Sequence, residues 1–398
     1  MNVTIQPTKL KGIVHAIPSK SQAHRLLICA AFSDKETIIH CPQINQDIEA
    51  TAVCLRALGA GVLRSEGNYI ISPIKQFPEK ALLPCKESGS TLRFLLPIAG
   101  AMGVDATFCM EGRLSKRPLS PLWEEMERMG CNLSRPSDST IRCTGRLNPG
   151  AYSISGSVSS QFITGLLFAM ALMDGESKLI ITDTLESKPY VDLTRAALKQ
   201  FCVDASTFSV SGSYPFHSPG IVNVEGDWSN GAFFLAAQAI GNPVSVSGLD
   251  PNSAQGDRII IDIIASLDTY QIVNATDIPD LVPILSVVAA SKKGCQFTGI
   301  HRLRIKESDR VASIMNMLRN LGIFTEATKN TLTIYPGKFL GGCVDAVNDH
   351  RIAMSAAIAA TAANGPVTIL GAECVAKSYP AFWDVYGSLG GIYEQYIR

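Results

Sequence analysis

The sequence lacks an excess of either charge. It contains 35 Lys and Arg residues against 35 Asp and Glu residues, so its formal net charge is zero. A general nucleic-acid-binding protein would carry a basic surplus, and we therefore do not expect that class. Charged residues make up 18% of the chain and hydrophobic residues 46%, a balance typical of a globular protein and not of a disordered one.

Long apolar runs and paired cysteines are also missing. The most apolar segment, residues 162–173, is shorter than the roughly 18 residues that a membrane span needs. The opening residues MNVTIQPTKLKG contain no apolar stretch of the signal-peptide kind. The 11 cysteines form no C-x-x-C pair, which argues against zinc ribbons and thioredoxin-like sites and favours buried, reduced thiols. We therefore expect a soluble, cytoplasmic protein that does not associate with membranes.

Motifs for the common cofactors are absent as well. The chain has no G-x-x-x-x-G-K-[ST], no G-x-G-x-x-G after an expected strand and no H-E-x-x-H. Its 6 histidines lack the spacing of metal ligands. We therefore expect neither a nucleotide cofactor nor a metal ion.

The sequence does contain a pattern that recurs six times. Each copy has a small or polar start, an apolar helix rich in small residues, a turn at Gly or a charged residue, and a short strand. The copies start mostly about 70 residues apart, which exceeds the 20–50 residues of solenoid repeats, so each copy predicts a small subdomain. The expected helices cover residues 19–32, 88–102, 159–173, 228–241, 280–294 and 348–365.

A second, amphipathic helix follows each of these apolar helices, as in residues 119–130 and 306–322. A helix that is apolar on every side is buried, whereas an amphipathic helix packs one face on a core. The pattern predicts an α/β protein of six βαβα-type units with extra strands. Six such units are too many for one core, so we expect two domains of three units each, divided near residues 223–227.

The apolar helices begin with unexpectedly polar and basic residues. Free N–H groups and the positive dipole end make a helix N-terminus suited to anions. Cations near these starts interact unfavourably with the positive end of the helix dipole. Because this energetic cost recurs on matching helices, the pattern predicts a ligand with several negative charges. At any one of these positions, simple capping by Ser or Asp is the alternative. The starts are Ser19-Lys20-Ser21, Ser88-Gly89-Ser90, Ser159-Ser160-Gln161 and Asp349-His350-Arg351.

Short motifs spread over nearly the whole chain resemble the enolpyruvyl transferase family, and among its members those that act on shikimate 3-phosphate. They stand in the order typical of that family. They are P-S-K-S-x-x-x-R (18–25), S-G-S-T-x-R (88–93), K-R-P-L (116–119), G-S-V-S-S-Q-F (156–162), S-K-P-Y (187–190), E-G-D (225–227), N-S-x-Q-G-D (252–257), I-P-D (278–280), R-I-K-E-S-D-R (304–310), N-D-H-R-x-A-M (348–354) and A-K-S-Y-P (376–380).

The resemblance implies a fold of two similar domains, each of three βαβαββ units with buried inner helices. Their N-termini would point at a cleft between the domains, which would hold the active site and close on substrate. The N-terminal strand, residues 1–12, would complete the second domain. We therefore expect an N-terminal domain of residues 13–226 and a C-terminal domain of residues 227–398.

The implied reaction transfers the enolpyruvyl group of phosphoenolpyruvate to the 5-hydroxyl of shikimate 3-phosphate. It passes through a tetrahedral intermediate and releases phosphate, as part of aromatic amino acid biosynthesis. It requires clamped charges, a base and an acid, but neither metal nor cofactor. Glyphosate competes for the phosphoenolpyruvate site in this family, and we expect the protein to be a monomer.

The resemblance also assigns site residues. The acid–base candidates are Lys20, Asp280, Glu307 and His350. The candidates for binding shikimate 3-phosphate are Lys20, Ser21, Arg25, Ser159, Ser160, Gln161, Ser187, Tyr190, Asp280 and Lys306. Those for binding phosphoenolpyruvate are Lys20, Gly89, Arg93, Arg117, Gln161, Arg310, Arg351 and Lys377. The arginine fork suits planar oxyanions because it donates two parallel hydrogen bonds.

Structural roles are the alternatives for several candidates. Asp280 could only cap a helix, and His350 could be a neutral cap. Lys306, Glu307 and Arg310 could form a solvated ladder of ion pairs on a first helical turn.

Some positions depart from the family pattern. Glu87 stands where Asn is frequent, Phe94 where Pro or Leu is frequent, and Arg302 where Asn is frequent. Glu87 and Phe94 leave the glyphosate response open, while Glu87 and Arg302 keep open a non-catalytic paralogue that binds anions or a protein partner. The rival enzyme, UDP-N-acetylglucosamine enolpyruvyl transferase, usually carries a reactive cysteine just before an R-P motif. The corresponding loop here, residues 111–118, has none.

Overall fold

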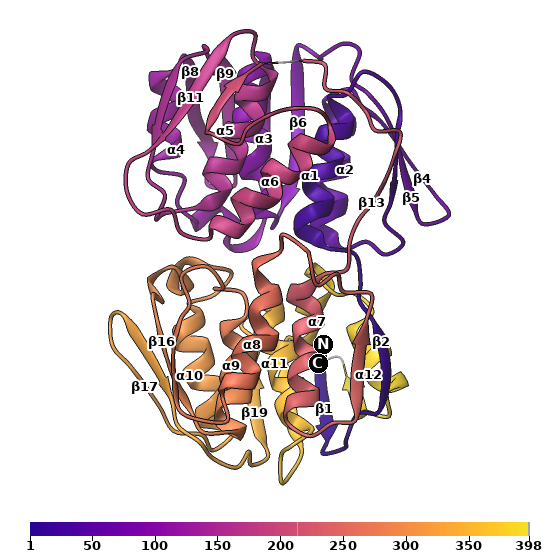
Figure 1. Ribbon diagram of the computed structural model, residues 1–398, viewed down its shortest axis with the longest axis vertical. Helices are drawn as coiled ribbons and strands as arrows, with labels where there is room; N and C mark the ends of the chain where they lie inside the picture. The colour runs from indigo at the N-terminus through magenta and orange to yellow at the C-terminus, as the bar shows by residue number, and fades with distance from the viewer. Residues whose placement is uncertain (213, 397–398) are drawn as a thin grey trace. The chain divides into compact units, whose positions relative to one another are not determined.

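The computed structural model describes residues 1–212 and 214–396 and consists of two compact units (Figure 1). The N-terminal unit is Pro18–Val224, and the C-terminal unit combines Met1–Ile17 with Glu225–Arg398. The sequence-based division put residues 13–17 in the N-terminal domain. In the structure these residues belong to the other unit, because β2 (Gly12–His15) pairs in parallel with β14 (Val244–Ser247).

The N-terminal unit contains three sheets. Each starts with a parallel pair and continues with antiparallel neighbours. In spatial order the first sheet is β13 (Ile221–Asn223), β3 (Thr37–His40), β5 (Asn68–Ser72) and β4 (Gly61–Ser65). The second is β6 (Lys80–Lys86), β7 (Asp105–Met110), β9 (Thr140–Gly145) and β8 (Cys131–Ser137). The third is β10 (Ala151–Ile154), β11 (Glu176–Ile181) and β12 (Ser209–Ser211).

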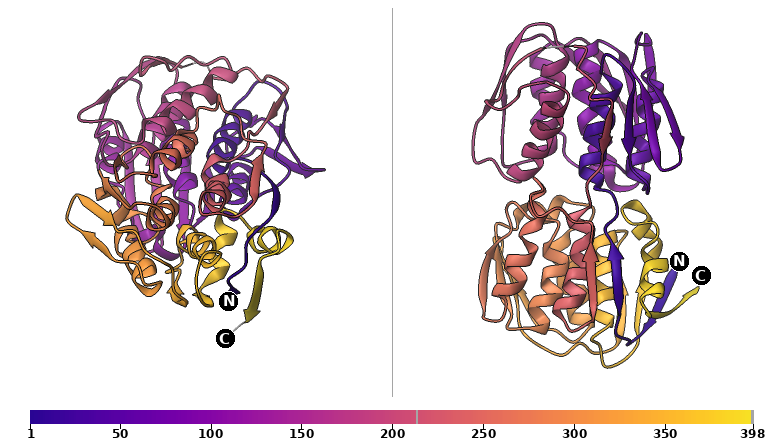
Figure 2. Two further views of the ribbon diagram at one scale, coloured as in Figure 1. Left: turned by 60° about the horizontal axis from the view of Figure 1, so that its bottom comes forward. Right: turned by 45° about the vertical axis from the view of Figure 1, so that its right-hand side comes forward.

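The C-terminal unit repeats this arrangement. One sheet has the order β15 (Gln271–Asn274), β16 (Cys295–Thr298), β18 (Thr331–Ile334) and β17 (Thr325–Ala327). Another is β19 (Gly342–Asp345), β20 (Val367–Leu370), β1 (Asn2–Gln6) and β21 (Ile392–Tyr396), and the third is β14 with β2. Strand β1 lies between β20 and β21, so the N-terminal strand is built into this sheet beside the end of the chain (Figure 2).

Two strands that each precede an inner helix are exchanged between repeats, so that each pairs with a strand of another repeat. Strand β2 precedes α1 (Lys20–Ala31) in the chain, yet it pairs with β14. Strand β13 precedes α7 (Trp228–Ala239), yet it pairs with β3. The sheet of β14 and β2 is the smallest of the six sheets formed by the described residues.

The apolar helices expected from the sequence form the inner layer of each unit. In the N-terminal unit they are α1, α3 (Gly89–Met102) and α5 (Ser160–Leu172), and α3 packs on α5 (Figure 1). Gly165 permits this approach, since a Cβ there would overlap the Arg93 carbonyl oxygen. In the C-terminal unit they are α7, α9 (Val282–Ser291) and α11 (His350–Ala360), which pack on one another.

The outer helices are shorter than the sequence suggested. The helix expected over residues 119–130 is α4 (Leu122–Arg128). The helix expected over residues 306–322 is α10 (Arg310–Asn320), whose start is fixed by the Asp309 side chain accepting the Ala312 N–H. The other outer helices are α2 (Gln46–Ala57), α6 (Lys188–Gln200), α8 (Ile260–Ser266) and α12 (Phe382–Ser388). Four 3₁₀ segments are η1 (Gly112–Lys116), η2 (Gly256–Ile259), η3 (His301–Ile305) and η4 (Ala372–Lys377).

Each unit has its own hydrophobic core. The expected buried thiols are confirmed at eight positions, while Cys109 is half-buried and Cys202 and Cys343 are exposed. Within the described ranges, no helix is long and apolar enough to cross a bilayer.

Candidate active site

Serine caps open the three inner helices of the N-terminal unit. The side chains of Ser19, Ser88 and Ser159 accept the backbone N–H groups of Gln22, Thr91 and Gln161. Capping is thus correct for these serines, but each cap satisfies only one of the four free N–H groups of a helix start. The remaining first-turn donors suit an anionic ligand.

Two arginines converge on the start of α3. A Cβ at Gly89 would lie 2.7 Å from Arg117 Nη1 and 3.2 Å from Arg93 Nη1. Arg93 Nη1 donates to Gln161 Oε1 at 2.7 Å, and Gln161 Nε2 donates to Ser90 Oγ at 3.0 Å. The structure therefore brings Gly89, Arg93, Arg117 and Gln161 together, in an arrangement suited to a phosphate or carboxylate.

Arg25 is a buried cation held by neutral oxygens. Its Nε donates to Thr194 Oγ1 at 2.8 Å, and its Nη2 donates to the Tyr190 carbonyl at 2.8 Å. Its Nη1 donates to the Ser21 carbonyl, so Ser21, Arg25 and Tyr190 lie together as the sequence predicted. Burial lowers the pKa of Arg25 to about 10. An anion beside this guanidinium would offset the loss of hydration.

Lys20 opens α1 and forms an ion pair with Asp47 of α2. Lys20 Nζ lies 3.0 Å from Asp47 Oδ2, and the two side chains are 16% and 19% exposed. The pair holds the ammonium group at the start of α1 while leaving it partly open to solvent. Asp47 was missed by the sequence analysis, because no local pattern links it to Lys20.

Asp183 fixes the loop that leads to Ser159 and Ser160. Its carboxylate accepts from the backbone N–H groups of Gly156 and Ser157 at 2.6 and 3.0 Å. It also accepts from the hydroxyls of Ser155 and Ser157 at 2.6 and 2.9 Å. These bonds, led by the one from Ser155, lower the pKa of Asp183. No motif in the sequence indicates a role for Asp183.

Ser187 occupies the cap position of α6 without a side-chain capping bond. Its φ of 54° is left-handed, and it is 1% exposed. The Tyr190 N–H donates to the Ser187 carbonyl at 3.1 Å, which ties the two predicted site residues to one turn.

Arg310 is the centre of the C-terminal unit's cluster. It is fully buried and donates to Asp349 Oδ2 at 2.9 Å, to Asp280 Oδ1 at 2.7 Å and to Glu307 Oε2 at 2.7 Å. The alternative of a solvated ladder on a helical turn is therefore wrong for Arg310. Lys306 and Glu307 precede α10 and do not belong to its first turn.

Asp280 does not cap a helix. Helix α9 begins at Val282 and has no side-chain capping bond. The carboxylate instead accepts from Arg310 and from Arg351 Nη2 at 3.1 Å, and Lys306 Nζ lies 3.8 Å away. Burial would raise the pKa of Asp280, but the charges of Arg351, Lys306 and Arg310 outweigh it and hold the pKa well below its usual value. Asp280 is therefore ionised at neutral pH.

Lys306 is an ammonium group that can lose its proton near neutral pH. Its side chain is 18% exposed. Burial lowers its pKa to about 8, the Asp280 charge opposes the decrease, and Arg302 and Arg310 add to it. A group with such a pKa can serve both as an anion-binding cation and in proton transfer.

Asp349, and not His350, caps α11. Its Oδ1 accepts the Arg351 N–H at 3.1 Å, while its Oδ2 accepts from Arg310. His350 follows the cap and is 2% exposed. Lys377 Nζ donates to the Asn348 carbonyl at 3.0 Å, so it lies next to this helix start.

Asp257 is a further buried carboxyl group near this cluster. It is 4% exposed. Burial and the Asp280 charge raise its pKa to about 7. It closes the N-S-x-Q-G-D motif at 252–257, to which the sequence analysis assigned no role.

Three departures from the family pattern have clear structural positions. The Glu87 carboxylate lies against Gly112, where a Cβ would overlap it. Phe94 is a core residue, 1% exposed, that packs on Phe168 and stands edge-on to His24. Arg302 is 6% exposed and lies close enough to lower the pKa of Lys306.

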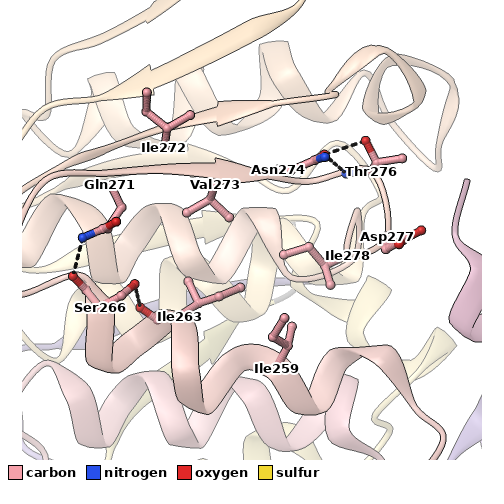
Figure 3. Close-up of a pocket in the computed structure, with 10 residues that line it drawn as sticks. All are labelled: Ile259, Ile263, Ser266, Gln271, Ile272, Val273, Asn274, Thr276, Asp277 and Ile278. Atoms are coloured by element: carbon pink, nitrogen blue, oxygen red, sulfur yellow. Dashed lines mark hydrogen bonds between the residues drawn. The ribbon is translucent and has the colours of Figure 1, made fainter.

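A groove outside both clusters lies beside α8 and the edge strand β15. Its volume is about 400 Å³, and Figure 3 shows Ile259 and Ile263 on one side, with Val273 and Ile278 on the other. It contains no predicted site residue. Within the described part of the chain, no group of three His, Cys, Asp or Glu side chains is placed to hold a metal ion.

The chain is similar to known proteins along almost its full length. The family model described as EPSP synthase (3-phosphoshikimate 1-carboxyvinyltransferase) matches residues 5–386. A 3-phosphoshikimate 1-carboxyvinyltransferase of Clostridium kluyveri is 39% identical, over 99% of this chain and 98% of that protein. A protein of the same name from Clostridium perfringens is 38% identical, over 98% of each chain.

Solved structures share the fold. An EPSP synthase from Acinetobacter baumannii matches with a TM-score of 0.81 and 24% identity, over 99% of this chain and 100% of that one. The enolpyruvyl transferase NikO from Streptomyces tendae matches with a TM-score of 0.73 and 18% identity, over 99% and 98%. These likenesses confirm the expected fold class of two domains built from repeated α/β units. Together with the family match and the curated relatives, they show that the chain belongs to the EPSP synthase family.

Proposed function

We propose that this protein transfers the enolpyruvyl group of phosphoenolpyruvate to the 5-hydroxyl of shikimate 3-phosphate and releases phosphate. The observation that carries the proposal is the start of α3, where Arg93 and Arg117 both approach Gly89. Two guanidinium groups at a capped helix N-terminus suit a small dianion, and phosphoenolpyruvate carries a phosphate and a carboxylate.

The phosphoenolpyruvate subsite combines this helix start with further predicted residues. Gly89 lets Arg117 approach the helix start, because a Cβ there would lie 2.7 Å from Arg117 Nη1, and we propose that it also leaves room for the ligand. Gln161 links Arg93 to Ser90 and so fixes the direction of the guanidinium. The remaining proposed ligands are Lys20, Arg310, Arg351 and Lys377.

The shikimate 3-phosphate subsite is proposed around Arg25. Its buried guanidinium is bonded to neutral oxygens and would be stabilised by a substrate anion. Asp183 supports the loop that carries two of the proposed ligands, Ser159 and Ser160. The other proposed ligands are Lys20, Ser21, Gln161, Ser187, Tyr190, Asp280 and Lys306.

The proposed reaction has two steps. First, the 5-hydroxyl oxygen bonds to the enol carbon, its proton passes to a base, and the methylene carbon takes a proton from an acid. Then the carbon–oxygen bond to phosphate breaks, phosphate leaves, and the new methyl group loses a proton to restore the double bond. We propose Asp280 as the group at the hydroxyl, Lys20 or Glu307 as the groups at the proton transfers, and His350 as an assisting residue.

Charge stabilisation supports this chemistry. The tetrahedral intermediate keeps both anionic groups of phosphoenolpyruvate, so the arginines that bind the substrate also stabilise the intermediate. The clusters of the two units are proposed to serve one pair of substrates.

UDP-N-acetylglucosamine is the substrate of the rival enzyme. The loop 111–118 has no cysteine, and the nearest one, Cys109, lies half-buried in β7. The test is to supply phosphoenolpyruvate with each acceptor in turn and to measure released phosphate. Release with shikimate 3-phosphate alone supports the proposal. Release only with UDP-N-acetylglucosamine, or with neither acceptor, overturns it.

We further propose that the enzyme works as a cytoplasmic monomer without a nucleic-acid partner. The zero net charge supports the absence of nucleic-acid binding. Light scattering during size-exclusion chromatography tests the oligomeric state, and a mass near 42.7 kDa is expected.

A further inference from the structure

A buried histidine near the proposed phosphoenolpyruvate subsite is not used in the chemistry above. His24 lies on α1, one turn after Lys20, and is fully buried. Its Nδ1 lies 2.7 Å from Thr51 Oγ1 of α2. Its Nε2 is buried with no hydrogen-bond partner in the described structure, and its ring stands edge-on to Phe94 with 6.3 Å between ring centres.

Three hydroxyl groups continue from His24 to the cap of α3. Thr51 Oγ1 lies 2.7 Å from Thr91 Oγ1, and Thr91 Oγ1 donates to Ser88 Oγ at 2.8 Å. Ser88 in turn accepts the Thr91 backbone N–H. All four residues are fully buried, so water does not compete for these bonds.

The direction of this chain follows from counting protons. A threonine hydroxyl has one proton to donate. Thr91 gives its proton to Ser88 or to the more distant Asp47 carbonyl, 3.5 Å away, and in both cases it must accept from Thr51. Thr51 has then used its own proton and must accept from His24. The ring therefore carries its proton on Nδ1, which agrees with an Nε2 that has no donor to bind.

The ring is also neutral. Burial lowers the pKa of His24 well below its usual value, and the nearby charges of Lys20 and Arg25 lower it further. A neutral ring protonated on Nδ1 leaves only a lone pair on Nε2. Burying this lone pair beside the apolar Phe94 ring costs less free energy than burying a charged ring there.

We propose that His24 is a positioning residue: its Nδ1–H starts a one-way chain through Thr51 and Thr91 that fixes Ser88 and thereby the first turn of α3. Gly89 directly follows Ser88, and Arg93 lies one turn later. The chain would thus hold the helix N-terminus in the orientation that phosphoenolpyruvate requires. This inference rests on the proposed phosphoenolpyruvate subsite at α3.

The first test compares variants of His24. His24→Leu removes the donor, whereas His24→Asn restores an N–H group close to the Nδ1 position. We expect His24→Leu to raise KM for phosphoenolpyruvate about fivefold, as for the loss of one buried hydrogen bond, with little change in KM for shikimate 3-phosphate. His24→Asn should restore most of the loss. Equal increases in both KM values, or no rescue by Asn, would overturn the inference.

A second pair of variants separates positioning from general destabilisation. Thr51→Val breaks the chain at its next link. Thr37→Val is the matched control, because Thr37 is a buried threonine of β3 whose hydroxyl lies 2.7 Å from Ser218 Oγ, outside the chain. Thr51→Val should raise KM for phosphoenolpyruvate as His24→Leu does, and the double variant should add little. The inference fails if Thr37→Val raises this KM equally.

A third measurement does not depend on activity. Long-range ¹H–¹⁵N NMR spectra of the histidine rings distinguish the two neutral tautomers, and the His24→Asn spectrum assigns the signal. We expect a neutral ring protonated on Nδ1. A ring protonated on Nε2 would overturn the direction of the chain, whereas failure of the wild-type protein to release phosphate would overturn the proposed function instead.

Discussion

Arg310 donates a hydrogen bond to Asp280 across 2.7 Å, although the two residues are 30 positions apart in the chain. The other carboxylate oxygen of Asp280 accepts from Arg351, so two arginines hold both oxygens of one carboxylate. This arrangement keeps the proposed base ionised and fixes its orientation before substrate arrives. The same contacts are expected to contribute to the stability of the C-terminal unit.

Replacement of Arg310 should therefore reduce stability as well as activity. Arg310→Leu leaves the fully buried Asp349 and the partly buried Asp280 without their shared cation. We expect the free energy of unfolding to fall by about 3–5 kcal/mol, measured by urea titration. The control is Arg142→Leu, which breaks an exposed pair with Asp105 and should change the free energy of unfolding little. Equal losses in the two variants would contradict the buried-pair assignment.

Replacement of Lys20 should reduce activity without reducing stability. Its ion pair with Asp47 is partly exposed, so Lys20→Ala should change the melting temperature little. Turnover should be abolished if Lys20 binds substrate or transfers a proton. Lys292→Ala is the control, since Lys292 makes a similar pair with Asp268 outside the site and should retain turnover. Loss of folding together with activity in Lys20→Ala would indicate a structural role.

Gly89→Ala should act on one substrate only. The new Cβ would lie 2.7 Å from Arg117 Nη1, so the guanidinium must move. KM for phosphoenolpyruvate should rise while KM for shikimate 3-phosphate stays nearly constant. Gly365→Ala is the control, because a Cβ there meets its neighbours at ordinary distances of at least 3.5 Å. An unchanged KM for phosphoenolpyruvate in Gly89→Ala would remove α3 from the subsite.

The lowered pKa of Lys306 predicts that activity falls at alkaline pH. Its pKa is lowered to about 8, so the free enzyme loses this cation as the pH rises through that value. We expect kcat/KM for shikimate 3-phosphate, which reports ionisations of the free enzyme, to fall above pH 8. Lys306→Arg should keep its charge there and shift the fall to higher pH, even if its overall rate is lower. The same pH profile in both proteins would exclude Lys306 as the titrating group.

The raised pKa of Asp257 predicts that the stability of the folded protein depends on pH. Its pKa in the folded protein is raised to about 7 by burial and by Asp280, above its ordinary value of 3.8. The folded state therefore binds the proton more tightly, and this contribution to stability is lost as the pH rises from about 4 to about 7. The melting temperature of Asp257→Asn relative to wild type should rise over that range and then level off. A difference that is independent of pH would contradict the raised pKa.

The sequence predicted the inner helices well because their signal is local. A run of small apolar residues between a polar start and a glycine predicts a buried helix wherever it occurs, and α3, α5 and α11 agree with it. The predicted start of α10 was wrong, because Lys306 and Glu307 have helical spacing with later residues and so suggested that the helix begins at Lys306. The Asp309 side chain caps the helix, which starts at Arg310, four residues after Lys306.

Long-range pairing could not be predicted in this way. The exchange of β2 and β13 depends on strand partners more than 180 residues away. The sequence of a short strand does not indicate which strand it pairs with. Asp280 resembled a helix cap in sequence, because its partners Arg310 and Arg351 are 30 and 71 residues distant. The resemblance to a family supplied the site residues, while the structure supplied the contacts among them.

The most direct test of the account is a ³¹P NMR time course with the wild-type protein, phosphoenolpyruvate and shikimate 3-phosphate. We expect both substrate signals to decline together while inorganic phosphate and one new phosphomonoester appear in equal amounts. Phosphate released without consumption of shikimate 3-phosphate, or no change in either substrate, would contradict the proposed transfer.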